Sequence, residues 1–66
     1  MFLLGNKLKE FRRLRGIGQL ELANAVGISR QYLSEIENQK KLPTVKIAFD
    51  CAKYLNVSVD DLFFYL

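Results

Sequence analysis

The segment that decides the fold is residues 18–38, GQLELANAVGISRQYLSEIEN. Its apolar side chains recur at the three- and four-residue spacing of amphipathic helices, and this pattern breaks at Gly27. We therefore predict one short helix that begins at Gln19, with Gly18 as its cap, and stops at Gly27. Ser29 is a good N-cap for a second short helix, which follows after a two-residue connector.

The second helix of this pair has an unusual polar face. At about 100° per residue, one arc holds five polar side chains, namely Arg30, Gln31, Ser34, Glu35 and Asn38. A helix that only has to be soluble usually carries lysine and glutamate pairs four residues apart, whereas these groups suit forked hydrogen bonds. The opposite arc, with Tyr32, Leu33 and Ile36, is expected to be core. Two short helices joined by a tight glycine turn form a helix-turn-helix.

Further helices are predicted on both sides of this pair. Leu8, Phe11 and Leu14 repeat every three residues after Asn6, a suitable N-cap, so a first helix extends to about Arg15. Past Pro43, Thr44 caps a longer helix with two apolar lines. Its expected core stripe consists of Val45, Ala48, Phe49, Ala52 and Leu55. The second line, which needs cover from another side, consists of Ile47, Cys51 and Tyr54.

The C-terminal end of the chain is predicted to form one more helical turn. Asn56 suits the left-handed end of the long helix, and Ser58 caps the last turn before the apolar tail LFFYL. This tail and the opening residues MFLL are predicted to pair as a short antiparallel ribbon. The expected fold class is therefore all-α, with five helices and a short two-stranded β-ribbon at the termini.

Length and charge are typical of a small globular domain with an anionic partner. Eight basic and four acidic side chains lie in residues 1–43, so the net charge of +3 is concentrated there. The stretch MFLL is too short for a secretion signal, and no run approaches the roughly 20 apolar residues of a membrane span. One cysteine cannot close a disulfide within the chain, so a cytoplasmic location is expected.

No catalytic constellation is evident in the sequence. There is no histidine, so zinc sites of the usual kind and histidine general bases are absent, and no cofactor or small-molecule site is evident. Cys51 is expected to be a small buried hydrophobe, and Tyr32 and Tyr54 are expected to lie at the rim of the core. An enzyme is therefore the least favoured class of protein.

From residue 8 to residue 63, the chain resembles the phage repressor and Cro-like (XRE-type) helix-turn-helix family of bacterial transcription regulators. The matching features are Gln19, the Glu21-Leu22-Ala23 triplet, Gly27, Ser29, the Ile36-Glu37 pair, Pro43 and Val57-Ser58. The resemblance implies one DNA-binding domain over residues 1–66, with the helix-turn-helix at about 19–38 and a dimerisation segment at about 57–66. Gly18 departs from the family's usual threonine or serine. Gln39 replaces a common glycine, so either Gln39 or Asn38 must take a left-handed turn.

The resemblance also implies that the helix after Ser29 lies in the major groove of double-stranded DNA. Arginine forks to guanine and glutamine to adenine, so Arg30 and Gln31 are the first candidates for base contact. Ser34 and Glu35 are further candidates, and Glu35 either accepts from cytosine or repels misplaced phosphate. The alternative is that all four are merely solvated polar residues.

Contacts outside the bases are implied in the same way. Five residues are expected at phosphates: Gln19, Ser29, Asn38, Lys40 and Lys41. Lysines in a loop are usually only solvated, so Gln19 and Asn38 are the stronger candidates. Glu37 is expected to form a structural ion pair with Arg12, because an unpaired carboxylate at the border of the apolar arc is costly.

These features together predict a transcriptional regulator, and more specifically a repressor that binds a palindromic operator as a homodimer. The expected dimer contact consists of Leu62, Phe63, Phe64, Tyr65 and Leu66, with some of Val57 and Val59. One alternative is that these aromatic residues are only intramolecular core. Another is a protein-interaction module, such as an antitoxin-like protein whose helix-turn-helix docks another chain.

Overall fold

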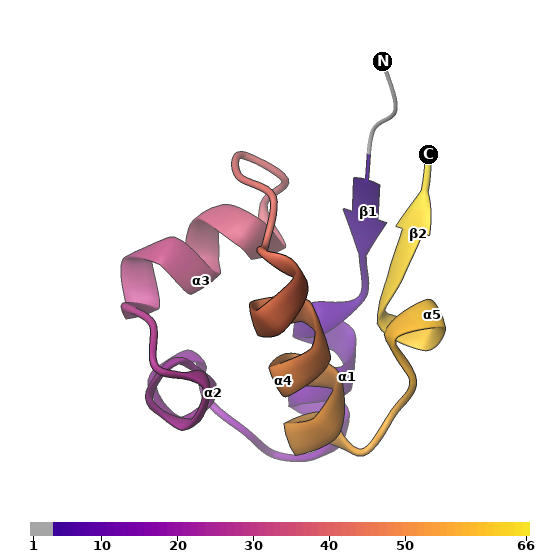
Figure 1. The fold of residues 1–66 in the computed structure, drawn as a ribbon. Coiled ribbons are helices and arrows are strands. Elements are labelled where there is room, and N and C mark those ends of the chain that lie inside the picture. The colour runs from indigo at the N-terminus through magenta and orange to yellow at the C-terminus, as the bar shows by residue number, and fades with distance from the viewer. Residues whose placement is uncertain (1–3) are drawn as a thin grey trace.

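A computed structural model describes residues 4–66 of the chain. Within this range the elements follow in the order β1 (Leu4–Asn6), α1 (Leu8–Leu14), α2 (Gln19–Val26), α3 (Arg30–Glu37), α4 (Val45–Leu55), α5 (Val59–Leu62) and β2 (Phe63–Tyr65). The expected five-helix fold with a terminal ribbon is therefore confirmed (Figure 1). Among residues 4–66, no helix has both the length and the apolar composition needed to cross a bilayer.

The helix boundaries follow from local hydrogen bonds that the sequence predicts. Ser29, Thr44 and Ser58 each accept a bond from the backbone N–H three residues later, at 3.0, 3.1 and 3.1 Å. Gly27 ends α2 and Asn56 ends α4, with left-handed φ values of 75° and 59°. Because each of these devices spans only a few residues, the local sequence is sufficient to place it.

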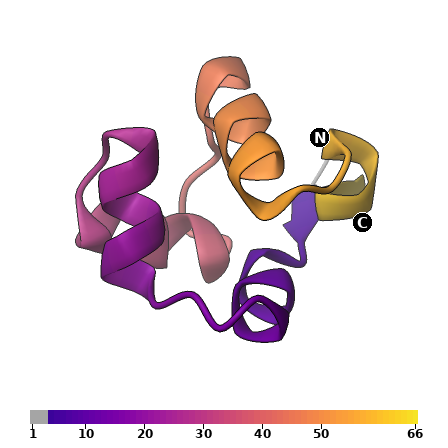
Figure 2. The ribbon, with the colours of Figure 1, turned by 90° about the horizontal axis from the view of Figure 1, so that it is seen from below.

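The core lies between two groups of elements. Figures 1 and 2 show α2 and α3 on one side of the molecule and α5 with the ribbon on the other, with α1 and α4 between them. Each helix contributes one leucine with no exposed surface, and these are Leu8, Leu22, Leu33, Leu55 and Leu62. Burying an aliphatic side chain of this size contributes about 1.5 to 3 kcal/mol, so this cluster is the main source of stability in a short chain.

The ribbon joins the two ends of the described chain. Its antiparallel register pairs Leu4 with Tyr65, Gly5 with Phe64 and Asn6 with Phe63. A Cβ atom at residue 5 would lie 2.6 Å from the outer edge of the Phe64 ring, so a larger residue here would require that ring to move. Of the stretch MFLL, residues 1–3 lie outside the described residues.

The predicted core stripe of α4 is confirmed for Ala48, Ala52 and Leu55 and wrong for the other two residues. Val45 and Phe49 are 74% and 61% exposed, whereas Cys51 of the second apolar line is buried and Ile47 packs against the core. The apolar arc of this helix spans about 220° at 100° per residue, which is wider than its neighbours can cover. The neighbours cover the middle of that arc and leave Val45 and Phe49 at its edge.

The turn after α3 is also settled by the structure. Gln39 takes the left-handed conformation, with φ of 63°, while Asn38 stays at φ −92°. The hypothesis that Asn38 takes this turn is therefore wrong. A residue with a Cβ atom in this conformation destabilises the fold by about 1 kcal/mol or more relative to glycine.

Candidate nucleic-acid interface

The first turn of α3 presents two polar side chains to solvent. Arg30 and Gln31 directly follow the Ser29 cap, and both are exposed. Neither side chain forms a hydrogen bond or ion pair with any residue in the range 4–66. The guanidinium and the amide are therefore available for an external partner, and they need not break an internal contact to reach it.

The inner face of α3 is anchored in the core. Leu33 and Ile36 are buried on the arc opposite Arg30 and Gln31. Tyr32 lies at the rim, where its hydroxyl donates to the Leu42 carbonyl oxygen at 3.2 Å. The helix therefore cannot roll about its axis without exposing two large aliphatic side chains.

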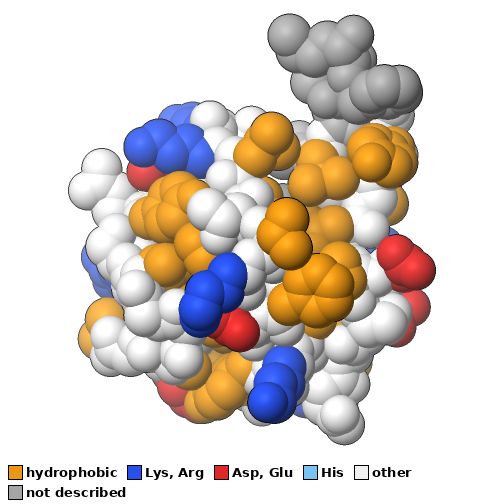
Figure 3. Space-filling model, viewed as in Figure 1, with side chains coloured by type: hydrophobic (Ala, Val, Ile, Leu, Met, Phe, Trp, Pro, Cys, Tyr) orange, Lys and Arg blue, Asp and Glu red, His pale blue; other side chains and the backbone are white. Residues whose placement is uncertain are grey.

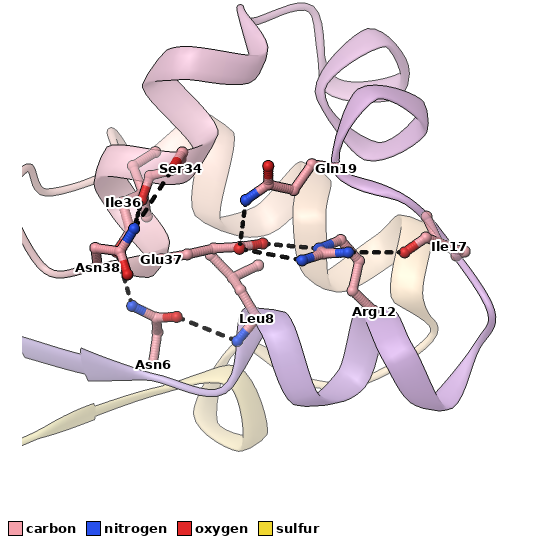
Figure 4. Close-up of polar contacts among 9 residues, drawn as sticks. All are labelled: Asn6, Leu8, Arg12, Ile17, Gln19, Ser34, Ile36, Glu37 and Asn38. Atoms are coloured by element: carbon pink, nitrogen blue, oxygen red, sulfur yellow. Dashed lines mark hydrogen bonds and ion pairs between the residues drawn. The ribbon is translucent and has the colours of Figure 1, made fainter.

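A buried charge network fixes the end of α3 to α1 and α2 (Figure 4). Arg12 donates through Nε and Nη2 to the two Glu37 carboxylate oxygens, at 2.8 and 3.2 Å. Its third contact is from Nη1 to the Ile17 carbonyl oxygen at 3.0 Å, and Gln19 Nε2 donates to Glu37 Oε1 at 3.0 Å. The side chains of Arg12 and Glu37 are only 9% and 2% exposed. The structure thus brings the predicted ion pair together in a forked, desolvated geometry.

Asn6 forms a second link to α3, which the sequence did not predict. The prediction that Asn6 is the N-cap of α1 is wrong by one residue, because the N-cap is Lys7, whose side chain forms no cap bond. Asn6 Oδ1 nevertheless accepts from the Leu8 backbone N–H at 3.2 Å, from one position before the cap. Its Nδ2 also donates to the Ile36 carbonyl oxygen at 2.9 Å (Figure 4). One amide thus links the ribbon, the start of α1 and the last turn of α3. An asparagine at the end of a strand was the only sequence signal for this contact.

The remaining candidates for base contact are partly engaged within α3 and its loop. Ser34 accepts from Asn38 Nδ2 through its carbonyl oxygen at 2.9 Å and its hydroxyl at 3.4 Å. Glu35 Oε1 lies 3.6 Å from Lys41 Nζ, in an ion pair whose side chains are 28% and 56% exposed. Such a surface pair contributes about 0 to 1 kcal/mol, so either partner can leave it at little cost.

The phosphate candidates lie on either side of α3. Ser29 and Gln19 precede or begin helices and already hold intramolecular bonds, through the Ser29 cap and the Gln19 contact with Glu37. The Gln19 amide oxygen accepts no hydrogen bond from residues 4–66. Lys40 is exposed, and Lys41 lies 5.9 Å from the centre of the Tyr32 ring. Gln19 was expected to face phosphate, but its amide nitrogen points into the Arg12–Glu37 network.

The C-terminal segment divides into buried and exposed residues. Leu62 has no exposed surface and Phe63 is 9% exposed, so both belong to the core of the single chain. Within the segment expected at a dimer contact, only Phe64, Tyr65 and Leu66 offer substantial surface to another molecule. Lys7 Nζ lies 6.0 Å from the centre of the Phe64 ring.

Comparisons with known proteins agree with this geometry. A sequence profile described as Helix-turn-helix matches residues 8–62. The HTH-type transcriptional regulator MJ0272 of Methanocaldococcus jannaschii is 43% identical over 60 residues, which cover 91% of each chain. The regulator YazB of Bacillus subtilis is 43% identical over 58 residues, covering 88% of this chain and 84% of YazB. A crystal structure of Bacillus subtilis SinR in complex with DNA matches with a TM-score of 0.72 and 32% identity, over 79% of this chain and 84% of the SinR chain in that crystal.

Proposed function

Because the chain belongs to the Cro/C1-like helix-turn-helix family of DNA-binding transcriptional regulators, we propose that it is a repressor that binds a palindromic operator as a homodimer. In this proposal α3 is the recognition helix, which lies in the major groove of double-stranded DNA. The family is not a class of enzymes, and regulation would follow from occupancy of the operator alone.

The observation that carries this proposal is the free polar start of a rigid α3. Arg30 and Gln31 are exposed and have no partner among residues 4–66, while Glu37 at the other end of α3 is fixed by Arg12 and Gln19. A major groove about 12 Å wide accepts one helix, where arginine forks to guanine and glutamine to adenine. A helix that is already held in place loses little entropy when it reads bases. Ser34 and Glu35 would contact bases further along the groove.

Phosphate contacts would set the position of α3 on the duplex. Lys40 and Lys41 in the loop after α3 supply positive charge, and the surface pair of Lys41 with Glu35 is weak enough to open. Ser29 at the start of α3, Asn38 at its end and the amide oxygen of Gln19 at the start of α2 would contact further phosphates. The N-terminus of α2 adds the positive end of a helix dipole next to Gln19.

Dimer formation would supply the specificity that one short helix lacks. A two-fold dimer sets two recognition helices about 34 Å apart, one turn of DNA, and so reads a palindrome. Phe64, Tyr65 and Leu66 expose apolar surface on the side of the molecule away from α3, and Val59, which is only partly buried, borders the same hollow as Phe64 and Tyr65. Val57 is also only partly buried. The homodimer is supported by this exposed apolar surface, which a second copy would bury.

Selection of bound sequences from a random duplex pool tests DNA binding, symmetry and sequence together. We expect a symmetric motif whose half-sites are one helical turn apart. Binding to the selected duplex should weaken steeply between two salt concentrations, because bound phosphates release counterions. A reporter with the selected site across its promoter should lose expression when the protein is present. Absence of any enriched motif would refute the proposal, and a rise in reporter expression would refute repression.

A further inference from the structure

Four exposed hydrophobic residues from α4 and the ribbon border one hollow on the surface. These residues, named here the Phe49 patch, are Val45, Phe49, Phe64 and Tyr65. The hollow between them has a volume of about 560 Å³, and its floor includes Ala48 and Phe63. Figure 3 shows hydrophobic side chains gathered over α4 and the ribbon on this face.

Phe49 stands between this hollow and a second one. The second hollow, of about 520 Å³, lies between the last turns of α4 and α5 and is bordered by Ala52, Lys53, Val57 and Asp60 as well as Phe49. The face therefore consists of an exposed aromatic ridge with a depression on each side. Such a shape complements its own copy, because a two-fold axis places the ridge of one chain in a depression of the other.

The charges around Phe49 are self-complementary as well. Lys53 and Asp60 are both exposed and border the same hollow from α4 and α5. Lys46, by contrast, is already paired with Asp50 at 2.6 Å. Figure 3 shows basic side chains to the left of and below the hydrophobic area, one of them beside an acidic side chain, and further acidic side chains at its right edge. A two-fold axis between Phe49 and the hollow that Lys53 and Asp60 border would place each Phe49 in the partner's hollow and bring Lys53 of one chain near Asp60 of the other.

The area is sufficient for a weak dimer. At 37% to 76% exposure, the Phe49 patch with the adjoining Leu66 presents on the order of 500 Å² per chain, given about 150 to 250 Å² for each aromatic side chain. A two-fold contact would then bury roughly 1,000 Å² in total, at the lower limit for a specific interface. A monomer rarely leaves so large an apolar patch exposed without a partner.

We propose that the Phe49 patch is the docking surface for a second copy of this chain, with Phe49 in the partner's hollow and Lys53 facing Asp60 of the partner subunit. This inference rests on the proposed homodimer and assigns its centre to α4 rather than to the C-terminal tail. Both ribbon views place α3 on the other side of α4 from the ribbon. The contact would therefore leave α3 of each copy uncovered.

Sedimentation equilibrium of the full chain over about 5 to 200 µM tests this surface. We expect the unmodified chain to approach a dimer at the upper end, and Phe49→Glu to weaken association at least a hundredfold. The matched control is Leu14→Glu, because Leu14 is an equally exposed hydrophobic residue on α1 and should leave association unchanged. Circular dichroism should show that both variants remain folded.

A charge-exchange experiment tests the orientation of the two copies. Lys53→Glu and Asp60→Lys should each weaken association about tenfold, because each puts like charges across the axis in two symmetric places. An equimolar mixture of the two variants should recover dimer, since every Lys or Glu at the axis then meets an opposite charge. A contact within one chain would not produce this recovery.

The outcomes separate this inference from the proposed function. A monomer mass for the unmodified chain at every concentration, with DNA present and absent, would overturn the homodimer and this surface together. A dimer that survives Phe49→Glu but is lost on Leu66→Glu would overturn this surface and leave the homodimer intact. Failure of the mixture to recover dimer would overturn the pairing of Lys53 with Asp60.

Discussion

Replacing Glu37 by alanine should destabilise the domain more than any other single loss of a charged side chain on α3. In the folded chain the Glu37 carboxylate accepts three hydrogen bonds, two from Arg12 and one from Gln19, at 2.8 to 3.2 Å. Its removal leaves the Arg12 side chain, which is 9% exposed, with the Ile17 carbonyl oxygen as its only hydrogen-bond partner among residues 4–66. The destabilisation comes mainly from leaving the Arg12 charge buried without a counterion, and less from the loss of the attraction between the two side chains.

The size of the effect follows from burial. Breaking a buried ion pair costs about 3 to 5 kcal/mol, and the lower end applies here because Arg12 keeps one bond and lies near the surface. A domain of this size has a total stability of roughly 3 to 10 kcal/mol, so Glu37→Ala removes a large share of it. At about 4 to 8 °C per kcal/mol, the melting temperature should fall by about 12 to 24 °C.

The assay is thermal unfolding followed by far-ultraviolet circular dichroism, with Glu35→Ala as the matched control. Glu35 lies on the same helix, but its 3.6 Å pair with Lys41 is exposed, so its loss should cost less than about 1 kcal/mol. The double variant Arg12→Met with Glu37→Met should recover much of the lost stability, because no lone buried charge remains. Equal melting temperatures for Glu37→Ala and Glu35→Ala would refute the reasoning.

Three further predictions concern α3, its loop and α4. Arg30→Ala should weaken binding to the best operator by about 1 to 3 kcal/mol and relax the preference for particular bases, whereas Lys40→Ala should weaken binding to all duplexes alike. Gel-shift titrations in which the Arg30→Ala variant keeps the base preference of the unmodified chain would contradict the base contact. Gln39→Gly should raise the free energy of unfolding by about 0.5 to 1 kcal/mol in urea titrations, because Gln39 holds a φ of 63°, while Asn38→Gly at φ −92° should lower it. Burial raises the pKa of the Cys51 thiol from 9.0 to about 11, so an alkylating reagent at pH 9 should modify it only in denaturant. The Cys51 contribution to stability should likewise be complete below pH 9 and fall as pH rises towards 11, because the unfolded thiol ionises first; a thiol that reacts equally fast in the folded chain would contradict this.

The sequence by itself determined the parts of this protein that depend on near neighbours. The caps at Ser29, Thr44 and Ser58 use backbone groups three residues away, and the left-handed ends at Gly27 and Asn56 use residue types that tolerate that conformation. Helix order, the helix-turn-helix and the polar face of α3 follow from these stops and from periodicity. Each of these features depends on residues close together in the chain, so the amino-acid sequence alone is sufficient to predict it.

Only the tertiary structure decided how those parts use their side chains. The Asn6 contact with Ile36 and the Gln19 contact with Glu37 join residues 30 and 18 positions apart, and nothing local distinguishes such an amide from one that faces solvent or phosphate. The same limit explains α4, whose apolar arc is continuous in the sequence although Val45 and Phe49 remain exposed. The hydrophobicity of a side chain determines only that its burial is favourable. The positions of α2, α5 and the ribbon decide which side of the apolar arc is covered within one chain.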